Sequence, residues 1–147
     1  MLNINTLDRL LRDELAATET YQLALDKFKL QVALGESEYL RPIYEDHKYA
    51  VSSLQAEIRQ LGETPSEDSG AWGAWVDVVQ EGANLLGKKT ALRVLQQGEK
   101  SGADDYEEVL QDPELPSDIR SLIETKLLPA QQAHIRTLDR LLEGARV

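Results

Sequence analysis

The chain has 147 residues, 41% hydrophobic and 29% charged, which is enough for one buried core. It has no cysteine, which excludes disulfides, iron–sulfur clusters and thiolate zinc sites. Its net charge of −10 disfavours binding to nucleic acid or to an anionic membrane surface. No apolar run is long enough to cross a membrane and the first residues do not resemble a signal peptide, so we expect a cytoplasmic protein.

Every element is predicted to be helical, because helix-forming residues dominate and no stretch alternates apolar with polar residues. The first helix is predicted from about Thr6 to about Ala33, with Asn5 or Thr6 as its cap. The turn at 35–37 then folds a second helix back beside the first.

The second helix is predicted to begin near residues 37–41, with Pro42 in its first turn or at an irregular start. Its apolar stripe stops at Gly62, which is a typical C-terminal signal. Residues 63–88 then break the helical rhythm. A helix of about 15 residues with extended flanks can travel the length of a bundle about 40 Å long, so we predict a crossover there. Trp72 and Trp75 are interpreted as its anchors, or alternatively as a patch for a partner or a second copy.

The third helix is predicted over about residues 89–111 and is followed by a loop with two prolines. Ser117 is predicted to cap the fourth helix, which runs to about Gly144. Pro129 should kink this helix by removing one backbone hydrogen bond. We expect one all-α domain over residues 1–147, a four-helix bundle made of a hairpin at 6–62, the crossover at 63–88 and a hairpin at 89–144.

Titratable residues interrupt the apolar stripe of each predicted helix. Glu14 interrupts the first stripe and Glu99 the third, and a tyrosine follows each of them one heptad later. The two histidines of the chain, His47 and His134, lie on the second and fourth stripes. The spacings repeat: 85 positions separate Glu14 from Glu99 and Tyr21 from Tyr106, and 87 separate His47 from His134 and Tyr44 from Gln131. The simplest explanation is one helical hairpin used twice.

Counting residues outward from each turn predicts that Glu14, Glu99 and His134 converge near the middle of the bundle. His47 is misplaced by roughly 15 Å in this count, so it joins them only if the second helix starts late. Burying such groups costs several kcal/mol apiece unless they are paired or bind a metal. Two carboxylates and neutral imidazoles would balance one divalent iron, manganese or zinc ion. Two carboxylates and two imidazolium ions would equally form a neutral network, so charge balance leaves both explanations open.

Residues 11–17, with the sequence LRDELAA, and the following Tyr21 resemble the first helix of ferritin-like proteins, including bacterioferritins. Gln131-x-x-His134 occupies the place of their Glu-x-x-His in the last helix. The chain is more closely similar to an uncharacterised bacterial ferritin-like family, domain of unknown function 2383, through residues 70–74, 98–100 and 127–129. The resemblance implies a ferritin-like four-helix bundle. It also implies Glu14, Glu99 and His134 as candidate ligands, with Tyr21 as a hydrogen-bond partner beside them.

The sequence departs from the family pattern where a di-iron site needs bridging glutamates, three residues before each histidine. Tyr44 and Gln131 occupy those positions. Glu45 and Asp46 are acidic, but their places next to His47 predict that they point away from the stripe. A working di-iron centre is therefore not expected, and neither is iron storage.

Two functional hypotheses follow, because no phosphate loop, nucleophile elbow or dinucleotide fingerprint is present and no catalytic residue is assigned. The first is a non-enzymatic structural, stress-associated or interaction protein with a metal-free polar network. The second is a metalloprotein that binds one iron, manganese or zinc ion, with redox chemistry conceivable. Its ligands would be Glu14, Glu99, His134 and His47, surrounded by Tyr21, Tyr106, Tyr44 and Gln131. The partners left open are a second copy of the chain and an unidentified protein.

Overall fold

The computed structural model describes residues 4–31, 35–67 and 88–144, and within them the chain is helical and contains no strand. The elements are α1 (Ile4–Gln31), α2 (Gly35–Gln60), α4 (Lys88–Leu110), α5 (Ser117–Leu122), the π-helical segment η3 (Ile123–Leu127) and α6 (Leu128–Gly144). The predicted all-α class is confirmed for these residues. No helix among them is both long and apolar enough to cross a membrane.

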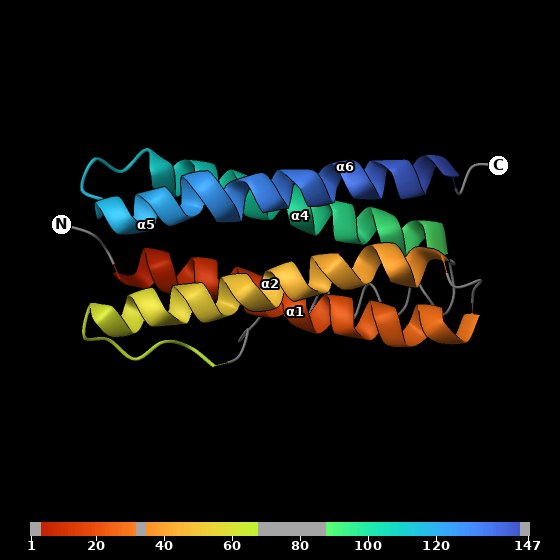
Figure 1. Cartoon of the computed structure of the whole chain (residues 1–147), viewed down its shortest axis with the longest axis horizontal. Helices are drawn as coiled ribbons and strands as arrows, with labels where there is room; N and C mark the ends of the chain where they lie inside the picture. The colour runs from red at the N-terminus through yellow and green to blue at the C-terminus, as the bar shows by residue number, and fades with distance from the viewer. Residues whose placement is uncertain (1–3, 32–34, 68–87, 145–147) are drawn as a thin grey trace.

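Two antiparallel hairpins lie against each other, with α1 and α2 in one and α4 with the continuous rod α5–η3–α6 in the other (Figure 1). Most of the predicted crossover, including Trp72 and Trp75, lies outside the described residues. Its first residues, 63–67, run back along α1, where the Ser66 backbone N–H and hydroxyl donate to the Asp8 carboxylate at 3.1 and 2.7 Å.

The starts of the first two helices differ from the prediction. Helix α1 begins at Ile4, so Asn5 and Thr6 lie in its first turn and the predicted cap at these residues is wrong. Helix α2 begins at Gly35, before the predicted range, and Pro42 lies inside it rather than in its first turn. Helix propensity alone does not fix such ends, because neighbouring turns and tertiary contacts decide where the first hydrogen bond forms.

The end of α2 is as predicted, because Gly62 closes it. Gly62 has a φ of 83°, in the left-handed region that glycine adopts at little cost. Its N–H donates to the Arg59 carbonyl at 2.9 Å, and the Glu63 N–H donates to the Ile58 carbonyl at 3.2 Å. These two bonds make a Schellman motif, which satisfies carbonyls that the helix end would otherwise leave unpaired.

The fourth rod differs from the prediction at its start and contains a π-helical segment that the sequence analysis did not predict. Ser117 is the first residue of α5, Pro116 holds the position before it, and no side chain caps this end, so the predicted cap is wrong. The helix also widens ahead of Pro129 into the π-helical segment η3, in which the Leu128 N–H donates to the Ile123 carbonyl five residues back. A wider turn relieves the clash that the proline ring would make with the preceding turn.

The core is divided into two apolar clusters, one toward each end of the bundle. One cluster contains Tyr21, Leu25, Leu40, Ile43, Leu92, Leu95, Leu138 and Leu142, together with smaller residues. The other contains Leu7, Leu10, Leu11, Leu54, Ile58, Tyr106, Val109, Ile119, Ile123 and Leu127, among others. Both clusters draw on all four rods. The titratable residues that the sequence singled out lie between them.

Candidate functional site

One titratable side chain from each rod meets its counterparts in a single layer, which we call the polar cluster. Glu14 comes from α1, His47 from α2, Glu99 from α4 and His134 from α6, and none of them is more than 4% exposed. Contacts between them span sequence separations of 33, 52 and 35 residues. The two hairpins therefore share one polar layer.

The sequence predicted that His47 reaches this layer only if the second helix starts late. His47 reaches it although α2 starts early, at Gly35, so this condition was wrong. Helix α1 ends 17 residues after Glu14, and α2 begins 12 residues before His47. The difference of five residues amounts to about 7.5 Å of helix, half of the mismatch expected. The count failed because it ran the first helix as far as residue 35 and started the second helix at residue 37, although α2 begins at Gly35. The remaining offset is small enough for the two side chains to meet.

His47 lies at the centre of the polar cluster, between the two glutamates. Its Nδ1 contacts Glu14 Oε2, and its Nε2 lies 2.6 Å from Glu99 Oε1. Burial disfavours a charged imidazole, but the two carboxylates outweigh burial and raise the pKa of His47 well above 6.5. Burial likewise opposes ionisation of Glu99, yet His47 and His134 lower its pKa to about 2. In the metal-free protein, an imidazolium thus bridges carboxylates from both hairpins.

Two tyrosines donate hydrogen bonds to the glutamates, each to the glutamate of the other hairpin. The Tyr21 hydroxyl of the first hairpin donates to Glu99 Oε1 of the second at 2.9 Å. The Tyr106 hydroxyl of the second hairpin donates to Glu14 Oε1 of the first at 2.5 Å. Burial and the adjacent carboxylates raise the pKa of both phenols well above 10, so both remain protonated donors.

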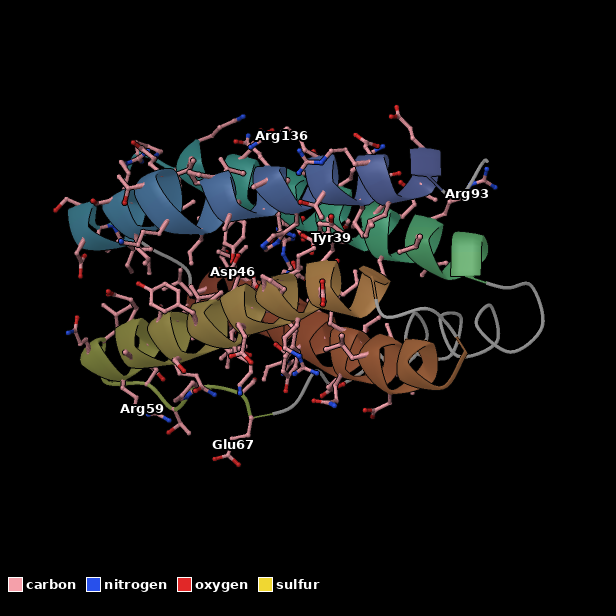
Figure 2. All side chains as sticks on the ribbon, turned by 45° about the vertical axis from the view of Figure 1, so that its right-hand side comes forward. Tyr39, Asp46, Arg59, Glu67, Arg93 and Arg136 are labelled. Carbon is pink, nitrogen blue, oxygen red and sulfur yellow. The ribbon has the colours of Figure 1, made fainter. Side chains whose placement is uncertain are left out.

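His134 connects the polar cluster to a residue that sequence reasoning missed. Its Nδ1 lies 3.3 Å from Glu99 Oε2, and its Nε2 lies 2.8 Å from Asp46 Oδ2. Asp46 was expected to point away from the site, but Figure 2 shows it on the side of α2 that faces α6. It is about half exposed, with a side-chain exposure of 54%. No apolar periodicity marks such a residue, so only its place beside His47 signalled it.

Tyr44 and Gln131, which stand where a di-iron site would have bridging glutamates, lie in different surroundings. Gln131 is buried, and its Nε2 donates to the backbone carbonyl of Glu99 at 3.1 Å, so it supports the polar cluster without offering a charge. Tyr44 packs half-buried against the apolar cluster around Leu40, with the Lys48 ammonium 5.3 Å from the centre of its ring. Only Gln131 is brought to the site.

A cavity adjoins the polar cluster on each side. One, of about 200 Å³, lies between α1 and α4 and is lined by Glu14, His47 and Glu99. Asp13 also lines it, and its two buried oxygens accept no hydrogen bond from the described residues. Burial, reinforced by the neighbouring carboxyl of Asp105, raises the pKa of Asp13 to about 8. The other cavity, of about 370 Å³, lies between α2 and η3–α6, at His47, His134 and Asp46.

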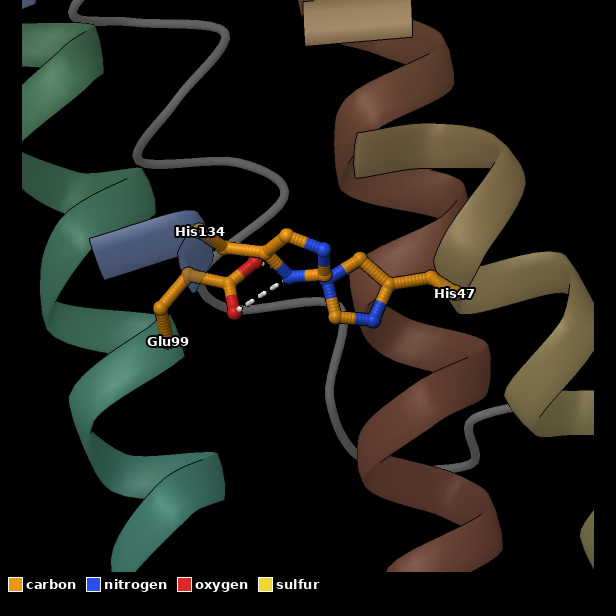
Figure 3. A group of neighbouring side chains, drawn as sticks. All are labelled: His47, Glu99 and His134. Atoms are coloured by element: carbon orange, nitrogen blue, oxygen red, sulfur yellow. Dashed lines mark hydrogen bonds and ion pairs between the residues drawn. The ribbon is translucent and has the colours of Figure 1, made fainter. Parts of the chain in front are cut away.

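The arrangement can hold protons or a metal ion. One ligand atom each from His47, Glu99 and His134 lies within 4.8 Å of the others, and all three residues are buried (Figure 3). Two imidazoles and a carboxylate are ligands that zinc and ferrous iron accept. The ring nitrogens and carboxylate oxygens of these three residues also make the hydrogen bonds described above. A proton in one of these hydrogen bonds and a metal ion would therefore occupy the same place.

Comparison with known protein families gives one match. The family model described as "Domain of unknown function (DUF2383)" matches residues 3–112, which include Glu14, His47 and Glu99 but not His134. No curated protein matches the chain.

Proposed function

The chain belongs to the family described as "Domain of unknown function (DUF2383)", and since that description assigns no activity, we propose a function from the polar cluster. The protein is a non-enzymatic structural or interaction protein, and its polar cluster locks the two hairpins together in one register. The observation that carries this proposal is that His47 contacts Glu14 of its own hairpin and Glu99 of the other.

The energetic reason is the cost of any other packing. Apolar faces tolerate several packing arrangements with similar energies, whereas a buried charge tolerates only the arrangement that pairs it. Sliding one hairpin along the other would leave Glu14 or Glu99 without its partners in a dry interior. Breaking one partner out of a buried pair costs about 3–5 kcal/mol, a large fraction of a domain's stability. The polar cluster thus selects one register.

We also propose that the two hairpins form a ferritin-like bundle with a degenerate site. The order of two antiparallel hairpins supports this arrangement, as do the matching positions of Glu14 with Glu99 and of His47 with His134. Gln131 presents a neutral amide where a di-metal site would have a bridging carboxylate. A second ion therefore lacks a charged ligand at that position.

Removing single hydroxyl groups from the metal-free protein tests the proposed lock. Tyr21→Phe and Tyr106→Phe each take one hydrogen bond from a buried carboxylate and leave the ring in place. We expect each to lower the free energy of unfolding, measured in urea with EDTA present, by about 1–3 kcal/mol. The matched control is Tyr49→Phe, since Tyr49 is 51% exposed and its variant should change stability by less than about 0.5 kcal/mol. Losses no larger than the control's in both variants would refute the lock.

A further inference from the structure

Each of the two imidazoles in the polar cluster has a carboxylate of its own at one ring nitrogen. His47 Nδ1 contacts the carboxylate of Glu14, and His134 Nε2 lies 2.8 Å from the carboxylate of Asp46. A carboxylate that accepts a hydrogen bond from one ring nitrogen fixes that nitrogen as the protonated one in a neutral imidazole. The lone pair then lies on the opposite nitrogen, which is Nε2 in His47 and Nδ1 in His134.

Both of these lone pairs are directed at one carboxylate. His47 Nε2 lies 2.6 Å from Glu99 Oε1, and His134 Nδ1 lies 3.3 Å from Glu99 Oε2. Figure 3 shows the two rings and the carboxylate converging from three different helices. Histidine ligands of metals commonly donate their other N–H to a carboxylate, and both histidines here have such a carboxylate.

We propose that His47 Nε2, His134 Nδ1 and the Glu99 carboxylate bind one divalent transition-metal ion, with Glu14 and Asp46 as positioning residues. This ligand set suits zinc or ferrous iron. It differs from the four ligands expected from the sequence, because Glu14 lies on the far side of the His47 ring from Glu99. Glu14 therefore orients a ligand and is not itself a ligand of this ion.

The charge of the polar cluster suits one divalent ion. Glu14 and Glu99 together carry two negative charges, and neutral imidazoles add none. One divalent ion therefore brings the polar cluster to zero net charge, and a neutral buried group is less costly than a charged one.

The surroundings provide room for an ion to enter. The cavity of about 370 Å³ between α2 and η3–α6 is lined by both histidines, and by Thr125 and Lys126 of the π-helical segment. Three protein ligands leave positions for water on a tetrahedral or octahedral ion, and this cavity is large enough to hold water. π-Helical turns are frequent beside functional sites, and η3 ends one turn before Gln131.

Calorimetry on the tag-free full chain, stripped with EDTA and desalted, tests the site with ZnCl₂, MnCl₂ and anaerobic Fe²⁺. We expect one zinc or ferrous ion per chain, and binding at least 100-fold weaker in Glu99→Gln and in His134→Ala. Asp46→Asn and Glu14→Gln should weaken binding by about 10- to 100-fold through loss of orientation. Glu45→Gln is the matched control on α2, because Glu45 is exposed and next to Asp46, and it should bind like wild type. No stoichiometric ion, two ions per chain, or unchanged binding in Glu99→Gln would each overturn the site.

A measurement on the wild type keeps the test decisive if a variant fails to fold. X-ray absorption of the zinc-loaded protein should show two imidazoles per ion, and one or none would overturn the ligand set. This inference goes beyond the proposed lock, and the two can fail separately. A chain that binds no metal but loses stability in Tyr21→Phe keeps only the lock. A chain that binds one ion but tolerates both tyrosine substitutions keeps only the metal site.

Discussion

Gly102 on α4 makes room for the buried amide that supports the polar cluster. A Cβ atom at this position would lie 2.4 Å from Gln131 Nε2, closer than Cβ atoms approach other atoms in proteins, and 3.3 Å from Gln131 Cδ, which is also tight. Gln131 is 4% exposed and donates to the backbone carbonyl of Glu99, so its amide has little freedom to withdraw. The glycine is therefore required by this contact and not by an unusual backbone angle.

We predict that Gly102→Ala changes stability in opposite directions in two backgrounds. In the wild type, overpacking against Gln131 should lower the free energy of unfolding by about 1–2 kcal/mol. In a Gln131→Ala background the obstacle is gone, so the higher helix propensity of alanine should stabilise the protein by about 0.5–1 kcal/mol. Urea denaturation of the four proteins in this cycle measures both effects. Stabilisation by Gly102→Ala in both backgrounds would show that the amide moves away without cost.

Single residues of the site could be predicted only where they break an expected pattern. Glu14, Glu99, His47 and His134 stand out in the sequence because a titratable side chain on an apolar stripe is costly and so needs a reason. Asp46 could not be found in this way, since it is half exposed and looks like any surface acid. Which ring nitrogen faces which carboxylate depends on helix rotation, which spacing alone does not specify.

At the scale of the helices, the fourth rod carries a signal for its π-helical segment. Its buried residues Ile119, Ile123, Leu127 and Gln131 follow one another at three successive spacings of four. In a regular α-helix, twelve residues turn the face by about 120°, which would carry Gln131 off the core. One extra residue in a π turn reduces this drift to about 20°. The segment η3 thus keeps one face buried, and Pro129 stabilises it by opposing a regular turn.

Deleting Glu124 tests this coupling between the π turn and the proline. Glu124 is exposed in η3, and its removal restores a regular helical spacing along the buried face. We predict that the deletion alone destabilises the protein by about 3 kcal/mol, because Pro129 then lies in a regular helix. The same deletion with Pro129→Ala should recover most of that loss in thermal denaturation.

Deleting the exposed Glu107 from α4 is the control, because a regular helix has no extra residue to lose. This deletion shifts the register of its helix, and Pro129→Ala should not rescue it. Equal rescue of both deletions would argue that Pro129 acts only as a general helix breaker and has no tie to η3.

The existence and order of the helices could be predicted because their apolar stripes are long, and Gly62 marked one end clearly. Ser117 and Asn5 misled the assignment of ends, since a residue type that favours caps also occurs within first turns. Pro129 predicts a kink in its helix. A proline in the sequence does not by itself reveal that the preceding turn widens into a π-helical segment.

At the scale of the whole molecule, the repeat seen in the sequence reappears as approximate two-fold symmetry in the contacts. Each histidine directs Nδ1 at the glutamate of its own hairpin, and each tyrosine donates to the glutamate of the other. The symmetry fails at Nε2, where His47 faces Glu99 but His134 faces Asp46. Position 133, which corresponds to Asp46, is an alanine. The bundle is therefore built from two similar halves around one asymmetric centre.

The charge states of this centre give the metal-free protein a defined dependence of stability on pH. The pKa of Glu99 in the folded protein is about 2, below its ordinary 4.5, so its contribution is complete above pH 4.5 and is lost as pH falls toward 2. The pKa of His47 is raised above 6.5, so its contribution is complete below pH 6.5 and is lost as pH rises through the folded value. Asp13, with a pKa raised from 3.8 to about 8, adds a loss of stability between these two values as pH rises.

We therefore predict that the EDTA-treated protein is most stable at about pH 4 and loses stability in both directions, because Glu99 protonates on one side and Asp13 and His47 deprotonate on the other. Urea denaturation between pH 3 and pH 9 measures the profile. Asp13→Asn should remove the loss that begins near pH 4, while the loss due to His47, which begins near pH 6.5, persists. Asp104→Asn removes the same charge from an exposed position and should leave the profile unchanged. A stability that rises from pH 5 to pH 8 would mean that the carboxyl of Asp13 and the imidazole of His47 are not protonated in the folded bundle.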